Sequence, residues 1–122
     1  GPTPGPGPIE VPGKLDGDKK LKKLKKSQYE FRCFQISGSN KFQLVLKTKN
    51  DQECDISFFA RGLDNNKNEN LSLLKAIDSS SNESIEISNN KMENVSTTPD
   101  PKIFNIEFNQ KRRFAIEIEL FV

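Results

Sequence analysis

The stretch IFNIEFNQKRRFAIEIELFV at residues 103–122 decides the fold class of this chain. It holds two runs in which large apolar side chains recur at every second position, and a polar turn at residues 109–112 separates the runs. A period of two is typical of a β-strand with one buried face, because successive side chains of a strand point to opposite sides of the sheet. The pattern predicts a β-hairpin. Its expected inward residues are Phe104, Ile106, Phe108, Phe114, Ile116, Ile118, Leu120 and Val122.

Alternating runs of the same kind occur upstream, at residues 29–36, 42–47 and 54–61. The first of them predicts a strand in which Phe34 and Ile36 continue the inward face after a bulge. A shorter apolar run at residues 71–77 is compatible with either a strand or a helical turn. Gly, Asn and Asp residues lie between the runs and favour turns, which predicts short connections between most of the strands.

Two polar stretches interrupt this series of strands. Residues 62–70 contain five Asn or Asp residues and predict an exposed loop. Residues 88–101 contain few apolar side chains and predict a long surface excursion. Six or seven short strands without a long amphipathic helix indicate an all-β chain, an antiparallel β-sandwich of about 6–8 strands with a jelly-roll-like architecture.

The first 26 residues differ from the rest in composition and charge. Ten of the fourteen Gly and Pro residues lie within the first 17 positions, and the run KKLKKLKK follows at residues 19–26. Residues 1–26 are therefore expected to be a flexible arm, Pro/Gly-rich and then Lys-rich, and residues 27–122 the β-sandwich domain. Seven Lys against three acids give the arm a net charge of +4, whereas 12 basic against 14 acidic residues give the domain −2.

The residue inventory excludes several kinds of chemistry. The chain has no His and no Trp, so a His-based triad, a His general base and a zinc site with His ligands are excluded. Asp55 lies on a predicted strand without an obvious carboxylate partner, and we expect no enzymatic activity, no cofactor, no metal and no small-molecule substrate. Cys33 and Cys54 are expected to be free thiols, with a bridge across a sheet as the open alternative.

Several stretches resemble the GOLD (Golgi dynamics) domain. They are Gly38 and Ser39, followed by FQLVLKT at residues 42–48 and DISF at residues 55–58. Near the end, IFNIEFN at residues 103–109 followed by FAIEIEL at residues 114–120 is similar to the closing hairpin of that family. The resemblance covers roughly residues 27–122 and implies a GOLD-like β-sandwich of the type found in lipid-transfer proteins and in Golgi and autophagy adaptors.

The resemblance also implies a function without chemistry, namely that the sandwich docks a protein partner in membrane trafficking at Golgi or endosomal membranes. It thereby implies a cytoplasmic location, with peripheral attachment to those membranes. No apolar run approaches the roughly 18 residues that suggest a membrane span. A partner-binding face is expected around Phe59 and Phe121, which the alternation points away from the core, together with Asp55. In the competing interpretation of the two rings, a second sheet or residues 88–101 cover them. In the competing interpretation of Asp55, its role is structural.

Basic residues suggest an alternative function, which is peripheral binding to anionic lipid. Two clusters would contact the lipid or an acidic partner, and they comprise Lys22, Lys23, Lys25 and Lys26 in the arm and Lys111, Arg112 and Arg113 in the predicted hairpin turn. The competing interpretation is that both clusters are ordinary solvated surface. A single-stranded nucleic acid is not expected as a partner, because the domain without its arm carries a net charge of −2.

Overall fold

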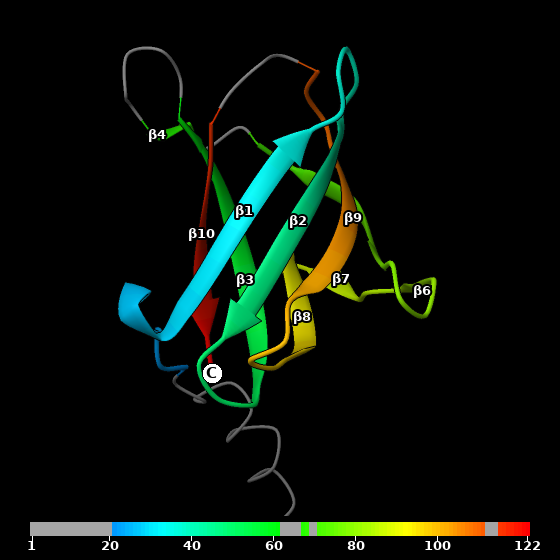
Figure 1. Cartoon of the computed structure of the whole chain (residues 1–122). Helices are drawn as coiled ribbons and strands as arrows, with labels where there is room; N and C mark the ends of the chain where they lie inside the picture. The colour runs from blue at the N-terminus through cyan, green and yellow to red at the C-terminus, as the bar shows by residue number, and fades with distance from the viewer. Residues whose placement is uncertain (1–20, 62–66, 69–70, 112–114) are drawn as a thin grey trace, which may run out of the picture.

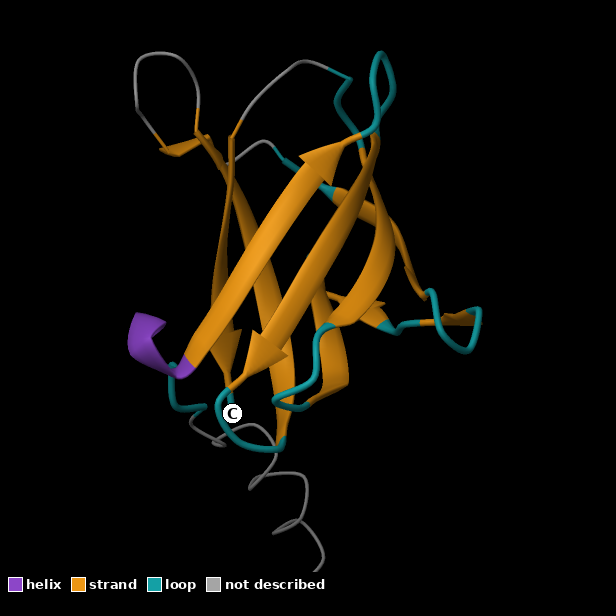
Figure 2. Ribbon diagram, in the orientation of Figure 1, coloured by secondary structure: helices purple, strands orange, loops and turns teal. Residues whose placement is uncertain are grey.

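The computed structural model describes residues 21–61, 67–68, 71–111 and 115–122, and these residues form a sandwich of two antiparallel sheets (Figure 1). The front sheet has the strand order β1-β2-β9-β5-β6, and the back sheet has the order β10-β3-β8-β7, with β4 paired to β3. The all-β prediction is confirmed, and the described residues contain no α-helix (Figure 2). A 3-10 turn, η2 (Lys26–Gln28), lies immediately before the first strand.

Seven strands have six or more residues, and three are two-residue strands. The front sheet consists of β1 (Tyr29–Gln35), β2 (Lys41–Thr48), β9 (Lys102–Phe108), β5 (Leu73–Asp78) and β6 (Glu83–Ser84). The back sheet consists of β10 (Ala115–Phe121), β3 (Gln52–Arg61), β8 (Lys91–Thr97), β7 (Ile87–Ser88) and β4 (Lys67–Asn68). The run at residues 71–77 is therefore a strand, whereas most of the predicted loop at residues 62–70 lies outside the described residues.

Apolar side chains from both sheets fill the space between them. Phe42 and Phe108 of the front sheet meet edge to face, with ring centroids 5.1 Å apart. Phe58 of the back sheet meets Phe108 in the same way at 5.4 Å. Aromatic pairs prefer this geometry because the positive edge of one ring faces the negative face of the other. Phe108 thus joins the two sheets at the centre of the core.

The predicted closing hairpin is wrong. β9 lies in the front sheet between β2 and β5, whereas β10 lies at the edge of the back sheet, paired with β3 from Ala115↔Arg61 to Phe121↔Asp55. The alternation of the two runs was a correct signal for two strands with inward apolar faces. Alternation carries no information about pairing partners, and here the two strands lie in different sheets, each with its apolar face toward the core.

The predicted surface excursion at residues 88–101 is also wrong. Residues 91–97 form β8, which pairs with β3 and buries Met92, Val95 and Thr97. The inward residues Met92 and Val95 are three positions apart because a bulge inserts an extra residue opposite Asp55, and Asn94 within it has a φ of 55°. A bulge breaks the period of two, so alternation could not reveal this strand.

The basic run was expected to belong to a flexible arm, but its described residues are hydrogen-bonded to the domain. Lys22 and Val122 exchange two backbone hydrogen bonds of 2.8 Å, and the Leu24 N–H donates to the Leu120 carbonyl at 2.8 Å. Leu24 is only 4% exposed and belongs to the core. The packed part of the domain therefore includes residues 22–26, on the N-terminal side of the expected boundary at residue 27.

Candidate functional site

The exposed large hydrophobic side chains of the described residues lie on the front sheet or directly beside it. Among the described residues, the exposed large hydrophobic residues are Phe34 (46%), Ile36 (53%), Leu74 (55%) and Ile103 (39%). Phe34 lies on β1, Leu74 on β5 and Ile103 on β9, and Ile36 follows β1 directly. The inward placement predicted for Phe34 and Ile36 is wrong, because β1 pairs with β2 in continuous register, without a bulge, and strict alternation turns Phe34 outward.

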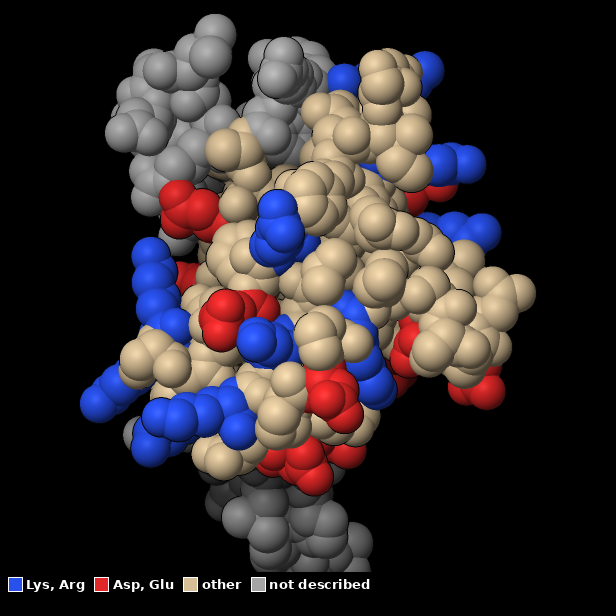
Figure 3. All heavy atoms as spheres, in the orientation of Figure 1, with Lys and Arg blue, Asp and Glu red and all other residues tan. Residues whose placement is uncertain are grey.

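The strand register brings Phe34 and Ile103 together with two half-buried side chains on the outer face of the front sheet, whereas Leu74 lies at the register shift of β5 and outside this group. Val45 of β2 lies directly opposite Ile103 of β9, and Phe34 and Ile77 lie diagonally on either side of this pair. Direct and diagonal cross-strand neighbours are within contact distance for large side chains. Figure 3, which looks onto this face, shows a broad uncharged area interrupted by single charged groups. We call the apolar residues Phe34, Ile36, Val45, Ile77 and Ile103 the front patch.

A shallow hollow lies at one side of the front patch. It has a volume of about 200 Å³, and its lining includes Ile36, Ile77, Lys41, Lys75 and Glu107. Lys41 and Lys75 flank Glu107 in the strand register, one on each neighbouring strand. The hollow therefore offers two apolar side chains and two ammonium groups to one bound side chain.

The outer faces of the two sheets carry opposite charge. Alternation directs four basic and two acidic side chains to the outer front face, which gives +2; they are Arg32, Lys41, Lys47, Lys75, Glu30 and Glu107. The described outer face of the back sheet has two basic and five acidic side chains when Lys23, which pairs with Phe121 beside β10, is included, and this gives −3; they are Lys23, Lys91, Glu53, Asp55, Glu93, Glu117 and Glu119. The front patch therefore lies in the more positive half of the domain.

The predicted partner-binding residues all lie on the outer face of the back sheet. Phe121 is directly opposite Asp55, and Phe59 is four residues further along β3. Both rings are half-buried, and the Lys91 ammonium lies 5.7 Å from the Phe121 ring centroid. Asp55 accepts a 3.1 Å hydrogen bond from the Asn94 N–H, so its carboxylate stabilises the bulge of β8. This face is more acidic and less apolar than the front patch.

The predicted basic clusters lie at opposite ends of β1. Lys22, Lys23, Lys25 and Lys26 are exposed beside the start of β1, and Lys23 forms a 2.9 Å ion pair with Glu119. Lys111 is exposed near the other end, where its carbonyl accepts a 3.0 Å hydrogen bond from the Gln35 side chain. A seven-residue strand spans about 20 Å, so one small ligand cannot contact both ends. Arg112 and Arg113 lie outside the described residues.

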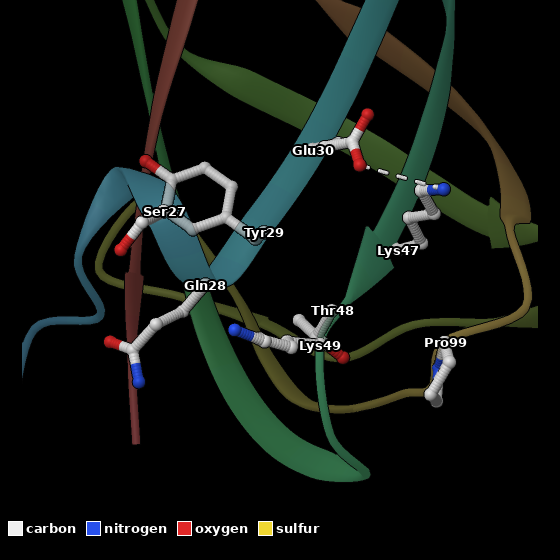
Figure 4. Close-up of a pocket in the computed structure, with 8 residues that line it drawn as sticks. All are labelled: Ser27, Gln28, Tyr29, Glu30, Lys47, Thr48, Lys49 and Pro99. Carbon is white, nitrogen blue, oxygen red and sulfur yellow. Dashed lines mark ion pairs between the residues drawn. The ribbon is translucent and has the colours of Figure 1, made fainter.

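A second hollow lies beside η2, between the start of β1 and the end of β2 (Figure 4). It has a volume of about 310 Å³, and Lys47 and Lys49 are among the residues that line it. Figure 4 shows Glu30 and Lys47 pointing toward each other, and their charged atoms are 3.5 Å apart. The lining brings together no pair of carboxylates and no nucleophile with a base. Within the described residues, no cluster of three or more Cys, Asp or Glu residues is arranged to hold a metal ion.

Cys33 and Cys54 are free thiols, as expected, and do not form the bridge that was the open alternative. Burial raises the pKa of the Cys33 thiol from 9.0 to about 12, and burial is also the main cause of the raised pKa of Cys54. A thiol with a raised pKa is a poor nucleophile, because the thiolate is the reactive form. Between pH 9 and about 12 the Cys33 thiol is ionised in the unfolded chain but still protonated in the folded protein. The free energy of unfolding therefore falls as the pH rises through this range.

We expect iodoacetamide to alkylate Cys33 slowly in the folded protein at pH 8. A rise of the pKa from 9.0 to about 12 lowers the thiolate fraction about a thousandfold, and the alkylation rate should fall by a similar factor relative to the unfolded chain. Mass spectrometry of the Cys33 peptide, with and without denaturant, measures both rates. Rapid alkylation of the folded protein would show that the thiol is reactive after all.

Comparison with models of protein families, with curated proteins and with solved structures found no match for this chain. The resemblance to the GOLD domain thus remains a prediction from the sequence. No helix among the described residues is long and apolar enough to cross a membrane.

Proposed function

We propose that this domain is a non-catalytic protein-interaction module that docks a partner on the front patch. The observation that carries the proposal is that the exposed large hydrophobic side chains of the described residues lie on the front sheet or directly beside it. Contiguous exposed apolar side chains rimmed by polar groups are typical of interaction sites, since leaving them in water is unfavourable. The proposed face differs from the back face around Phe59, Phe121 and Asp55 that was predicted from sequence.

The charge of the front face indicates which partner surface fits it. Arg32 lies 5.1 Å from the Phe34 ring centroid, and Lys41 and Lys75 border the hollow beside Ile36. A partner that buries its apolar side chains here also brings its flanking residues next to these cations. Acidic flanking residues would accelerate association and favour the correct orientation. We therefore propose a partner segment that combines apolar and acidic side chains.

The resemblance to the GOLD domain adds a cellular setting to this proposal. In that setting the module acts as an adaptor in membrane trafficking, in the cytoplasm and at the surface of Golgi or endosomal membranes. The second candidate function is peripheral binding to anionic membranes. It is supported by the side chains of Lys22, Lys25 and Lys26, which remain exposed while their backbone is held against the domain. The protein partner is preferred because Glu30 and Glu107 lie among the cations of the front face and would be repelled by anionic lipid.

The experiment compares one variant of each face in quantitative affinity capture. Phe34→Ser with Ile103→Ser removes apolar area from the front patch, and Phe59→Ser is the matched change on the back face. Loss of interface anchors typically costs about 2 kcal/mol or more, so we expect at least tenfold weaker capture by the front variant only. Because Phe34 and Ile103 are exposed, the front variant should change the free energy of unfolding by less than about 1 kcal/mol.

The same proteins are tested for flotation with phosphatidylserine vesicles at low and high salt. Capture that is lost with Phe59→Ser but kept by the front variant would place the partner on the back face and contradict the proposal. Salt-sensitive flotation without any protein capture would instead support the membrane function.

A further inference from the structure

Strand β1 is an open edge of the front sheet. Among the described residues it pairs with β2 alone, through an uninterrupted register from Tyr29↔Thr48 to Gln35↔Phe42, and it contains no proline. The backbone bonds from Ile36 to Lys41 and from Lys49 to Gln28 show that the even-numbered residues of this strand bond to β2. Odd-numbered residues therefore direct their backbone groups to the open side. Proteins usually protect such an edge with a bulge, a proline or a covering segment.

The facing edge of the back sheet is already covered in part. Residues 22–24 pair with the last residues of β10 through three backbone hydrogen bonds of 2.8 Å. The chain then leaves β10 at Lys25 and crosses through η2 to the start of β1. No described residue pairs in the same way with the open side of β1, and the backbone N–H groups of Phe31 and Cys33 have no hydrogen-bond partner among the described residues.

A groove separates the open side of β1 from β10. Its part nearest to β1 has a volume of about 320 Å³ and is lined by Tyr29 and Phe31 on one wall and by Glu117 and Ile118 on the other, with Lys26 at the end. An adjoining hollow of about 550 Å³ extends toward Lys23 and Phe59. The half-buried inward side of Phe31 forms part of the apolar wall. The space beside the free backbone groups can therefore receive side chains.

We propose that β1 binds an extended peptide segment of a partner protein as an additional strand of the front sheet. The backbone of the peptide pairs with the free N–H and C=O groups of Phe31 and Cys33. Its alternate side chains enter the groove between Phe31 and Ile118 and are apolar, and the remaining side chains join the outer front face beside Glu30 and Arg32. Strand addition of this kind obtains its affinity from main-chain hydrogen bonds and its specificity from alternate side chains. The proposed peptide site on β1 is independent of the proposed docking function of the front patch.

The probe is a synthetic octapeptide in which Val alternates with Lys and Thr, titrated into the full chain labelled with ¹⁵N. We expect saturable shifts of the backbone amide signals of Phe31 and Cys33. Two further octapeptides have the same side chains and carry N-methyl groups on alternate amides, the odd-numbered amides in one and the even-numbered amides in the other. Successive N–H groups of a strand point to opposite edges, so each peptide lacks the donors of one edge only. We expect the peptide whose methyl groups face β1 to bind at least tenfold more weakly and the other to keep its binding.

On the protein side, Cys33→Pro removes an edge N–H that does not bond to β2, and Cys33→Val is its matched control. We expect the proline variant to lose binding at least tenfold and the valine variant to keep it. If the proline variant fails to fold, the methylated peptides still decide the question without any change to the protein.

Four results would overturn the proposal. One is the absence of shifts up to the solubility limit of the peptide, and another is equal binding of the unmethylated peptide and both methylated peptides. The third is a concentration-dependent shift of the Phe31 and Cys33 signals without peptide, which would show that β1 pairs with a second copy of this chain. Peptide-induced shifts confined to the signals of Phe34 and Ile103 would also exclude β1 as the site, and they would support the front patch instead.

Discussion

Replacing Phe108 by alanine is expected to lower the free energy of unfolding by about 3–5 kcal/mol, the usual cost of removing a buried phenyl group. Phe108 is 0% exposed, and its ring contacts Phe42 in its own sheet and Phe58 in the facing sheet. The substitution thus removes both edge-to-face contacts and leaves a cavity where the sheets meet. Neighbouring strands cannot close this cavity without breaking their own hydrogen-bonded registers.

Urea unfolding followed by circular dichroism measures this loss. The matched control is Phe34→Ala, which removes the same side chain from the exposed face of the same sheet and should change stability by less than about 1 kcal/mol. A loss of stability for Phe108→Ala no larger than that of the control would show that the two sheets are not held together by this aromatic cluster.

The second large effect is expected for Leu24→Ala, with a loss of about 2–3 kcal/mol. Leu24 is 4% exposed and is the core residue supplied by the basic run. Removing a buried leucine side chain costs about 2–5 kcal/mol. The lower part of this range applies because residues 22–24 pair with only one strand and can shift to fill part of the space.

The neighbouring Lys25→Ala is the control, since Lys25 is exposed and forms no ion pair with another described residue. It should leave the midpoint of urea unfolding almost unchanged. Equal stability of Leu24→Ala and Lys25→Ala would mean that the basic run is a detached arm, as the sequence alone predicted. A loss confined to Leu24→Ala would show that residues 22–26 belong to the folded domain.

The positions of most long strands were predictable from alternation. The runs at residues 42–47 and 54–61 correspond to β2 and β3, and their inward residues are buried. Strand β8 was missed because its bulge breaks the period of two at Asn94. Leu24 was missed because an apolar residue among lysines has no local signal of burial. It is buried through its pairing with the other end of the chain.

The candidate site was only partly predictable. The outward direction of Phe59 and Phe121 was predictable from the alternation of β3 and β10, and both lie on the outer back face. The exposure of Phe34 and Ile36 could have been found by extending the alternation of residues 29–33 without a bulge. Phe34 was assigned to the inward face because a bulge was expected after Cys33, and the continuous register of β1 with β2 contains none. Ile103 directly precedes the inward Phe104, so alternation also predicts its outward direction, but only the pairing shows that it lies opposite Val45.

The sequence by itself determined that this chain forms β-strands and, for most of them, which side chains face inward. Those properties depend on residues next to one another, because the backbone of a strand turns successive side chains to opposite sides. The tertiary structure alone decided that β9 and β10 belong to different sheets, that Leu24 completes the core and that no other described segment covers β1 or the front patch. Strand pairing and the burial of a sheet face depend on contacts between residues far apart in the chain. Many different pairings of the same alternating strands bury equally apolar faces. Only packing of the whole domain selects one of them.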